Sequence, residues 1–358
     1  MTHANASFSP EDRVQQFMVD YETQWHIAAP LFDSRDSAAS RRPFEVWREL
    51  MEQTTRNHFT LTTTVNLAGV FGRPAEYGPQ AEVFVRADVE GDTAYVITQM
   101  TSGLESLHEY ALQREGQDWR IVSIADHYDE PTAPFVDQPT IEQNLTTTGP
   151  AAELRELPPE QRALDEVRNF AERDVVRPKD QQLARAEVSS LGTFVTSSGA
   201  LAVIDFGYDN DDARPLARTV PPGAYPVERV TAFGRNAAVR IRFTDDQPVE
   251  WHPASLADSG HVVGVDAGCV CIVDYVGYAS MSRRSKAAAL TAFFAETRPC
   301  AMTFDLASGG IGVATDSGYG DGSYPVYWGV DSEGRIAQLV VDFMVLVNQD
   351  DDGVLTTL

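Results

Sequence analysis

A glycine-rich segment near the C-terminus, Gly318-Tyr319-Gly320-Asp321-Gly322, is the part of the sequence with the strongest potential for chemistry. Three glycines in five residues allow turns with positive φ, and Asp321 can ligate a cation or accept a hydrogen bond within its own turn. The segment lacks the Lys-Ser/Thr pair of a nucleotide-binding loop, and the residues after it predict a strand. We therefore favour a tight β-turn over a ligand site.

Several aspartates stand alone near the ends of predicted strands. Asp266 lies in Val265-Asp266-Ala267-Gly268, and Asp205, Asp274, Asp321 and Asp342 have similar settings. Converging carboxylates could bind Ca²⁺ or Mg²⁺ or perform acid–base work, but aspartate is also common in turns. We predict no metal site and no cofactor.

The histidines are scattered and form no pair at metal-binding spacing, which argues against zinc. His127, beside Asp126 at the end of a predicted strand, could act as a base at the mouth of a pocket, although a solvated strand end is the simpler interpretation. No Gly-x-Ser-x-Gly elbow is present. The sequence thus predicts no catalytic residues, and we expect a protein that is not an enzyme.

Aromatic residues crowd the segment that follows the glycines. Tyrosine and tryptophan anchor protein interfaces but also fill cores, and we expect Trp328 in the core and Tyr319 partly exposed. The candidate residues for binding a partner or ligand are Asp266, Tyr319, Asp321, Tyr324, Tyr327 and Asp331.

The first 130 residues predict an α+β domain, with helices on one face of a curved antiparallel sheet. Ser9 can cap a helix over residues 8–29, and a second helix is expected over 43–58. Trp25 and Trp47 fall on the inward faces of these helices and, with Asp126 and His127, are candidates to line an N-terminal cavity. The expected strands are 59–67, 81–89, 93–100, 107–114 and 119–125.

This order of elements, which closes with Tyr110-Ala111-Leu112-Gln113-Arg114 and Trp119-Arg120-Ile121-Val122-Ser123, resembles the nuclear transport factor 2-like cone fold. More narrowly, residues 8–130 resemble the bacterial immunity-protein branch of that fold. The fold also hosts isomerases, dehydratases and binding modules, so the resemblance implies no single activity.

Residues 131–182 are rich in proline and polar residues and suggest a linker with a short helix. Residues 183–358 predict a mostly antiparallel β domain with one or two helices, including one over 282–297. The three cysteines, Cys269, Cys271 and Cys300, are too few for a disulfide framework, and we expect buried free thiols.

The second domain carries four separated motifs in a fixed order. They are Leu191-Gly192-Thr193 with Ser198-Gly199 and Asp205, the segment 220–227, Gly264-Val265-Asp266-Ala267-Gly268, and the segment 317–331 with Val341-Asp342-Phe343. Over about residues 185–347 these motifs resemble the bacterial family called domain of unknown function 4241. The resemblance implies no established reaction, and the family sometimes lies beside toxin and immunity genes.

The chain has 53 acidic residues against 28 lysines and arginines, a formal net charge of -25. Such a charge repels phosphate backbones and favours a basic protein partner, although solubility or adaptation to salt would also explain it. We find no signal peptide and no stretch that could span a membrane, so we expect a cytoplasmic protein.

Together these features predict a cytoplasmic bacterial immunity protein that binds a cognate secreted polymorphic toxin, itself basic, and covers its active site. The alternative is a small-molecule-binding protein or enzyme that uses the N-terminal cone cavity. The sequence predicts neither the oligomeric state nor which domain faces the toxin.

Overall fold

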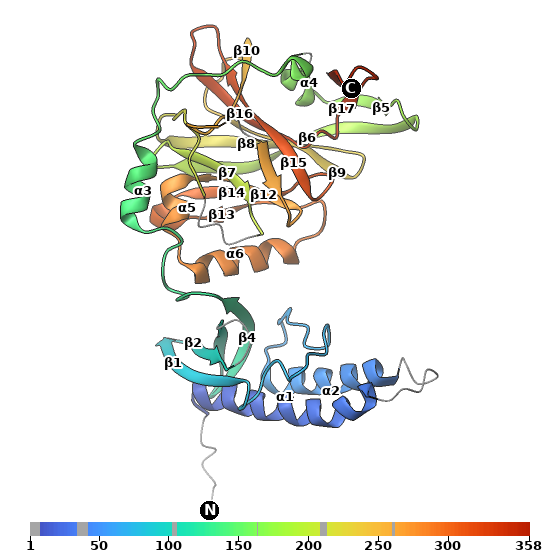
Figure 1. The fold of residues 1–358 in the computed structure, drawn as a ribbon, viewed down its shortest axis with the longest axis vertical. Coiled ribbons are helices and arrows are strands. Elements are labelled where there is room, and N and C mark those ends of the chain that lie inside the picture. The colour runs from blue at the N-terminus through green and yellow to red at the C-terminus, as the bar shows by residue number, and fades with distance from the viewer. Residues whose placement is uncertain (1–7, 34–41, 102–105, 163, 208–212, 260–261) are drawn as a thin grey trace, which may run out of the picture. The chain divides into compact units, whose positions relative to one another are not determined.

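The computed structural model describes residues 8–33, 42–101, 106–162, 164–207, 213–259 and 262–358. Contacts divide the chain into two compact units, Met1–Pro131 and Thr132–Leu358. Unit 1 has helices followed by strands, and unit 2 is mostly antiparallel sheet with short helices, which confirms the predicted α+β class (Figure 1). Among the described residues, no helix combines the length and apolar character needed to cross a bilayer.

Helix α1 (Pro10–Phe32) of unit 1 starts where the sequence predicts. The Ser9 side chain accepts a hydrogen bond from the backbone N–H of Asp12, and the Asp12 side chain accepts one from Ser9, which together form a capping box. The buried residues of α1 include Val14, Phe17 and Tyr21, and their spacing forms one apolar stripe. Through this stripe α1 packs against the core of unit 1.

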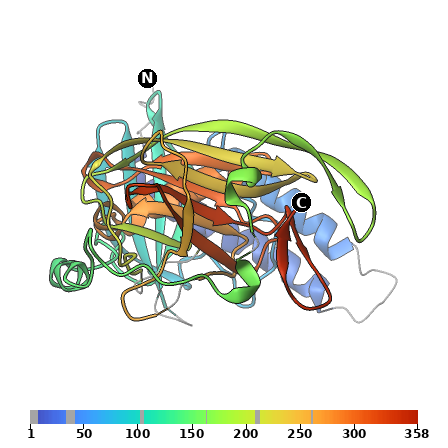
Figure 2. The ribbon, with the colours of Figure 1, turned by 90° about the horizontal axis from the view of Figure 1, so that it is seen from above.

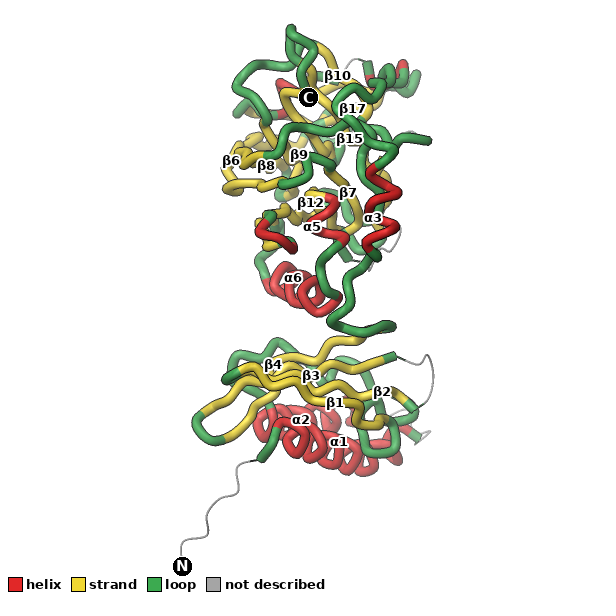
Figure 3. The backbone as a smooth tube through the Cα atoms, turned by 90° about the vertical axis from the view of Figure 1, so that its left-hand side faces the viewer, coloured by secondary structure: helices red, strands yellow, loops and turns green. Residues whose placement is uncertain are grey.

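Helix α2 and the sheet complete unit 1. The four strands pair in chain order as an antiparallel meander, and Figure 3 shows both helices against one face of this sheet. Tight turns at Gly91 and Gly116, both with positive φ, connect neighbouring strands. The elements are α2 Arg42–His58, β1 Glu82–Glu90, β2 Thr93–Met100, β3 Leu107–Glu115 and β4 Asp118–His127.

The strand predicted over residues 59–67 is wrong. Only Phe59 forms an isolated bridge, to Ile121, and the rest of the segment is turns and irregular structure. The threonine-rich sequence explains the difference, since the Thr63 hydroxyl donates to the carbonyl of Val122 and accepts from the N–H of Val65. Such side-chain bonds compete with a regular strand ladder.

Within the described part of unit 2, all strands except β17 and β18 pair antiparallel in one large sheet with the order β10-β15-β16-β9-β8-β6-β14-β12-β7, which β5, β11 and β13 join at its sides. Strands β17 and β18 pair with each other in a separate sheet. In Figure 2, β6 in green runs beside the yellow β8. The strands are β5 Arg173–Arg177, β6 Gln182–Thr196, β7 Leu201–Asp205, β8 Gly223–Ala232, β9 Arg235–Arg242, β10 Glu250–Pro253, β11 Val262–Val265, β12 Cys269–Asp274, β13 Ala301–Asp305, β14 Ile311–Asp316, β15 Gly322–Val330, β16 Ile336–Asp342, β17 Val347–Gln349 and β18 Leu355–Thr357.

Strand β12 separates two apolar cores. Val270 and Ile272 face a cluster that contains Trp328, whereas Cys271 lies in a second cluster together with Phe293. All three cysteines are free and buried, as predicted. The helices of the unit are α3 Gln138–Leu145, α4 Glu166–Asn169, α5 Tyr275–Ala279 and α6 Arg283–Ala295, with 3₁₀ turns η2 Pro159–Gln161 and η3 Ala307–Gly309.

The sequence suggests residues 131–182 as a linker, but all of this segment except Pro131 is part of unit 2 in the structure. Phe135 and Ile141 are buried in the second core cluster, and β5 pairs with the first half of β6. Proline-rich composition therefore marks an irregular path here, but the path is packed against the sheet.

Candidate functional site

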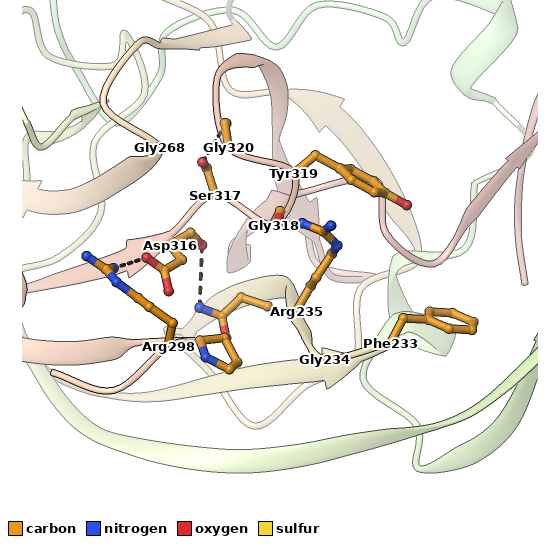
Figure 4. Close-up of a pocket in the computed structure, with 12 residues that line it drawn as sticks. Phe233, Gly234, Arg235, Gly268, Arg298, Asp316, Ser317, Gly318, Tyr319 and Gly320 are labelled. Carbon is orange, nitrogen blue, oxygen red and sulfur yellow. Dashed lines mark hydrogen bonds and ion pairs between the residues drawn. The ribbon is translucent and has the colours of Figure 1, made fainter. Parts of the chain in front are cut away.

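The glycine-rich segment borders a cavity in unit 2. We call this space, of about 500 Å³, the glycine-loop cavity (Figure 4). It lies between the loop that joins β14 to β15, the turn that joins β8 to β9, and the chain entering β13. Its lining residues are Phe233, Gly234, Arg235, Asn236, Gly268, Arg298, Pro299, Asp316, Ser317, Gly318, Tyr319 and Gly320.

Two glycines give the β14–β15 loop its shape. Gly318 has φ +68°, and a Cβ atom there would lie 2.8 Å from the carbonyl oxygen of Asn236, so only glycine fits. Gly320 has φ +95°, and its carbonyl accepts hydrogen bonds from Ser317 Oγ (2.7 Å) and Tyr324 Oη (2.8 Å). The hydroxyl groups of Ser317 and Tyr324 thus stabilise the conformation of the loop.

Two guanidinium groups line the cavity. Arg235 Nη1 donates to the carbonyl of Gly318 (2.7 Å), and the guanidinium carbon lies 4.9 Å from the centre of the Tyr319 ring. Arg298 forms an ion pair with Asp316 Oδ1, while Asp316 Oδ2 accepts from the N–H of Cys300 (2.6 Å). Figure 4 shows the two arginines reaching the cavity from different chain segments.

Asn236 forms part of the cavity wall and is fully buried. Its Nδ2 donates to the carbonyl of Cys300 (2.7 Å) and to Thr315 Oγ1 (2.9 Å). These bonds join β9 to the chain entering β13 and to the end of β14, so a buried polar side chain fixes the wall of the cavity.

Among the residues predicted to bind a partner, Asp266, Tyr319 and Asp321 are exposed. Asp266 lies in the β11–β12 turn, and the others lie in the β14–β15 loop. The two loops meet where the N–H of Ser317 donates to the carbonyl of Gly268 (3.1 Å). We call residues 266–268 and 317–321 the acidic loop pair.

Tyr324, Tyr327 and Asp331 are buried and have partners within the chain. Tyr327 Oη donates to Gln161 Oε1 (3.1 Å). Asp331 accepts from the Arg335 backbone N–H (3.0 Å) and from Arg335 Nε (2.8 Å), and these bonds lower the pKa of its carboxyl. The structure therefore places these side chains in folding roles, and Tyr324 acts on the acidic loop pair only from within, through its bond to the carbonyl of Gly320.

The other predicted aspartates serve the backbone. Asp205 Oδ2 accepts from the N–H of Asp266 (2.6 Å) and of Ala267 (3.1 Å), which fixes the β11–β12 turn. Asp274 caps α5 by accepting from the N–H of Gly277 (2.8 Å). No group of three or more His, Cys, Asp or Glu in the described part of the chain is arranged to hold a metal ion.

The N-terminal candidates do not enclose a shared space. Trp47 is fully buried and its Nε1 donates to the carbonyl of Val70 (3.1 Å), whereas Trp25 is half-buried and donates to the carbonyl of Gly72 (2.9 Å). The Trp47 ring packs edge-on against the buried Tyr21 ring, with centres 5.5 Å apart. Aromatic rings therefore occupy the region between the helices and the sheet.

The candidates at the end of β4 differ in exposure. The Asp126 side chain is 73% exposed, whereas His127 is buried and its Nε2 lies 3.9 Å from Glu109 Oε1. Asp126 Oδ1 lies 3.0 Å from Nε2 of His108, and this bond lowers the pKa of Asp126. The histidine that engages Asp126 is thus one that sequence reasoning did not single out.

His108 belongs to a buried polar cluster in unit 1. Its Nδ1 lies 3.1 Å from Oε2 of the fully buried Glu82, which also accepts from Tyr110 Oη (2.9 Å) and from Thr98. Burial lowers the pKa of His108, but the carboxylates of Asp126 and Glu82 outweigh it and raise that pKa to about 9. Only strand register, which the sequence does not specify, brings these residues together.

Unit 2 contains two buried carboxyl groups that interact with each other, Glu166 and Asp342. Asn169 Nδ2 donates to Glu166 Oε2 (2.8 Å) and to Asp342 Oδ2 (3.3 Å), and all three residues are at most 2% exposed. Burial, together with the charge of Asp342, raises the pKa of Glu166 well above its usual value, and burial raises that of Asp342 to about 6. The pair therefore holds a proton near neutral pH.

Comparison with known proteins gives one finding. A family described as "Protein of unknown function (DUF4241)" matches residues 194–341, which supports the resemblance of the C-terminal part. No curated protein and no solved structure matches the chain. The resemblance of residues 8–130 to the nuclear transport factor 2-like fold has no support from these comparisons.

Proposed function

We propose that this chain is a cytoplasmic immunity protein that binds a cognate basic toxin and covers its active site. The acidic loop pair forms the centre of the contact. Asp266 and Asp321 pair with basic side chains of the toxin, and Tyr319 supplies an aromatic anchor.

The observation that carries this proposal is the juxtaposition of Asp266, Tyr319 and Asp321. They come from segments about fifty residues apart in the sequence, yet they are exposed on loops joined by the bond between Ser317 and Gly268. Tyr319 is 51% exposed although it is a large aromatic residue. An exposed tyrosine on the same loops as two exposed carboxylates fits a contact with a basic protein surface.

The charge balance supports the same conclusion. Many arginines are already neutralised within the chain: Arg335 lies within 3.0 Å of carboxylate oxygens of Asp331, Asp246 and Glu333. Arg185 similarly pairs with two acidic residues. The excess carboxylates of a chain with a net charge of -25 therefore define its surface potential and speed encounter with a cationic partner.

The alternative, a ligand or substrate inside the N-terminal unit, has weaker support. Tyr21, Trp47 and Phe59 are at most 4% exposed and fill the region that a cone cavity would occupy. A cavity of about 540 Å³ in unit 1 is lined by residues of α2 and of the segment 65–68, and not by these rings. A binding role for the exposed surface is the better interpretation.

The test is co-expression of the full chain with the product of a neighbouring toxin gene, followed by co-purification. We expect the chain to restore growth and to co-elute with the toxin. The double variant Asp266→Lys/Asp321→Lys should weaken both effects by at least about tenfold, because charge reversal at the centre of an interface costs several kcal/mol.

The matched control is Glu156→Lys/Asp174→Lys, which reverses two charges at side chains that are 89% and 83% exposed elsewhere in unit 2. This variant should protect like the original chain. Equal loss of protection in both variants would mean that overall charge, and not the acidic loop pair, is responsible. Absence of co-elution with any neighbouring toxin would contradict the proposal as a whole.

A further inference from the structure

We propose that the glycine-loop cavity is a binding site for a small phosphate-bearing molecule. The site consists of the Arg235 and Arg298 guanidinium groups and the backbone of Gly318 to Gly320. This inference goes beyond the toxin-binding proposal: the cavity shares Tyr319 and the β14–β15 loop with that contact, but the site rests on the arginines and the loop backbone and not on Asp266 and Asp321.

The first step is the local charge. Two arginines and one carboxylate line the cavity, so its walls carry an excess positive charge in a chain whose net charge is -25. Asp316 pairs with Arg298, whereas Arg235, within the described residues, hydrogen-bonds only to a backbone carbonyl. The excess positive charge of the lining is therefore that of Arg235.

The second step is the donors that remain. Among the described residues, the structure gives Arg235 one hydrogen bond, from Nη1 to the carbonyl of Gly318. The other N–H groups of its planar fork are left for a ligand or water. Arginine forks match phosphate geometry through paired N–H···O bonds, and Arg235 supplies the open fork here because Arg298 already pairs with Asp316.

The third step is the loop backbone. For the N–H groups of Gly318 and Gly320, the structure records no acceptor among the residues it describes. Both glycines line the cavity and both have positive φ. Successive N–H groups in such a loop form a concave anion-binding surface of the kind found in phosphate sites.

The fourth step is size and screening. A volume of about 500 Å³ lies within the range of small-molecule sites and accommodates a nucleotide or a pyrophosphate. Asp266 and Asp321 do not line the cavity and are exposed, so water and salt screen their repulsion beyond about 8 Å at physiological ionic strength. The negative surface therefore does not prevent an anion from binding inside.

The experiment is calorimetric titration of the full chain with pyrophosphate, ADP and citrate in separate arms. We expect saturable binding of pyrophosphate or ADP at one site per chain, at least about tenfold tighter than citrate. Tighter binding of ADP than of pyrophosphate would identify a nucleotide as the source of the phosphate, whereas equal binding would identify the phosphate groups alone. Both results support the site.

Arg235→Ala should weaken phosphate binding at least about tenfold, and Arg235→Lys should restore only part of it, because a single ammonium cannot reproduce the fork. The matched control is Arg185→Ala, which removes an exposed arginine of unit 2 outside the cavity. Thermal melting establishes that each variant is folded. No saturable binding, equal binding of citrate, or equal weakening by Arg185→Ala would overturn the proposal.

Discussion

Glu82 in unit 1 and Glu166 in unit 2 are both almost completely buried, yet they meet different neighbours. Glu82 is surrounded by donors: Tyr110, Thr98 and the imidazole of His108. Glu166 faces another carboxyl group, Asp342, and the amide of Asn169 bonds to both. The same residue type therefore meets donors in one unit and a second carboxyl group in the other, where burial and the charge of Asp342 raise the pKa of Glu166.

This difference teaches how each unit tolerates a buried acid. In unit 1 an opposite charge and hydroxyl donors replace the water that Glu82 loses on folding. In unit 2 no basic side chain contributes to the shifted pKa of Glu166, and the pair is neutralised in part by protonation. The buried acid of unit 1 consequently depends on a partner residue, whereas the buried acids of unit 2 depend on holding a proton.

The largest effect is expected from breaking the pair in unit 1. His108→Ala leaves Glu82 buried without its opposite charge, so the free energy of unfolding of unit 1 should fall by about 3–5 kcal/mol. Chemical denaturation of the full chain, followed by tryptophan fluorescence, measures the change.

Asp126→Asn is the matched control, because it removes the other carboxylate of His108 at a side chain that is 73% exposed. Exposed ion pairs contribute about 1 kcal/mol or less, so this variant should change little. If Asp126→Asn lowered the free energy of unfolding as much as His108→Ala, the contact of His108 with the buried Glu82 would contribute no more than its contact with the exposed Asp126.

Sequence patterns predicted the helices and strands better than they predicted the polar contacts between them. Ser9, Pro10 and the apolar spacing of α1 act within a few residues of one another, so the start of this helix was predictable. The contact between His108 and Glu82 depends on the pairing register of β1, β2 and β3, which includes a bulge near Phe84. Such long-range register leaves no local signal.

The same dependence on long-range packing explains which residues of the candidate site were predicted and which were missed. The glycines at 318 and 320 were visible as a turn, and the exposure of Tyr319 was expected. Arg235 and Arg298 were missed because they lie on different segments, and only the packing of the sheet brings them to one cavity. An arginine that follows a hairpin turn, as Arg235 follows Phe233-Gly234, was the one available hint.

The second prediction concerns the pH dependence of stability, and we expect each unit to lose stability over its own pH range. His108 has a folded pKa of about 9 against 6.5 in the unfolded chain, so its contribution is complete below pH 6.5 and is lost as pH rises through 9. Asp342 has a folded pKa of about 6 against 3.8, so its stability is lost as pH rises from about 4 through 6. At about 1.4 kcal/mol per pKa unit, each loss amounts to about 3 kcal/mol.

Denaturation of the full chain between pH 4 and pH 9 measures both windows. Asp342→Asn should flatten the dependence at the acidic end and leave the alkaline end unchanged, whereas His108→Gln should do the reverse. A flat profile below pH 7 in the unchanged protein would show that the acidic pair of unit 2 does not share a proton.

The smallest effect is expected from replacing two glycines, one in each unit, that have the same φ. Gly318 and Gly116 both have φ +68°, but a Cβ atom at Gly318 would lie 2.8 Å from a carbonyl oxygen, whereas none would have a neighbour within 4 Å at Gly116. Gly116→Ala should therefore cost only the left-handed backbone penalty of about 1 kcal/mol, and Gly318→Ala about 2–3 kcal/mol. Thermal unfolding of the two variants measures the difference, and equal costs would show that the β14–β15 loop moves aside and does not hold the cavity in a fixed shape.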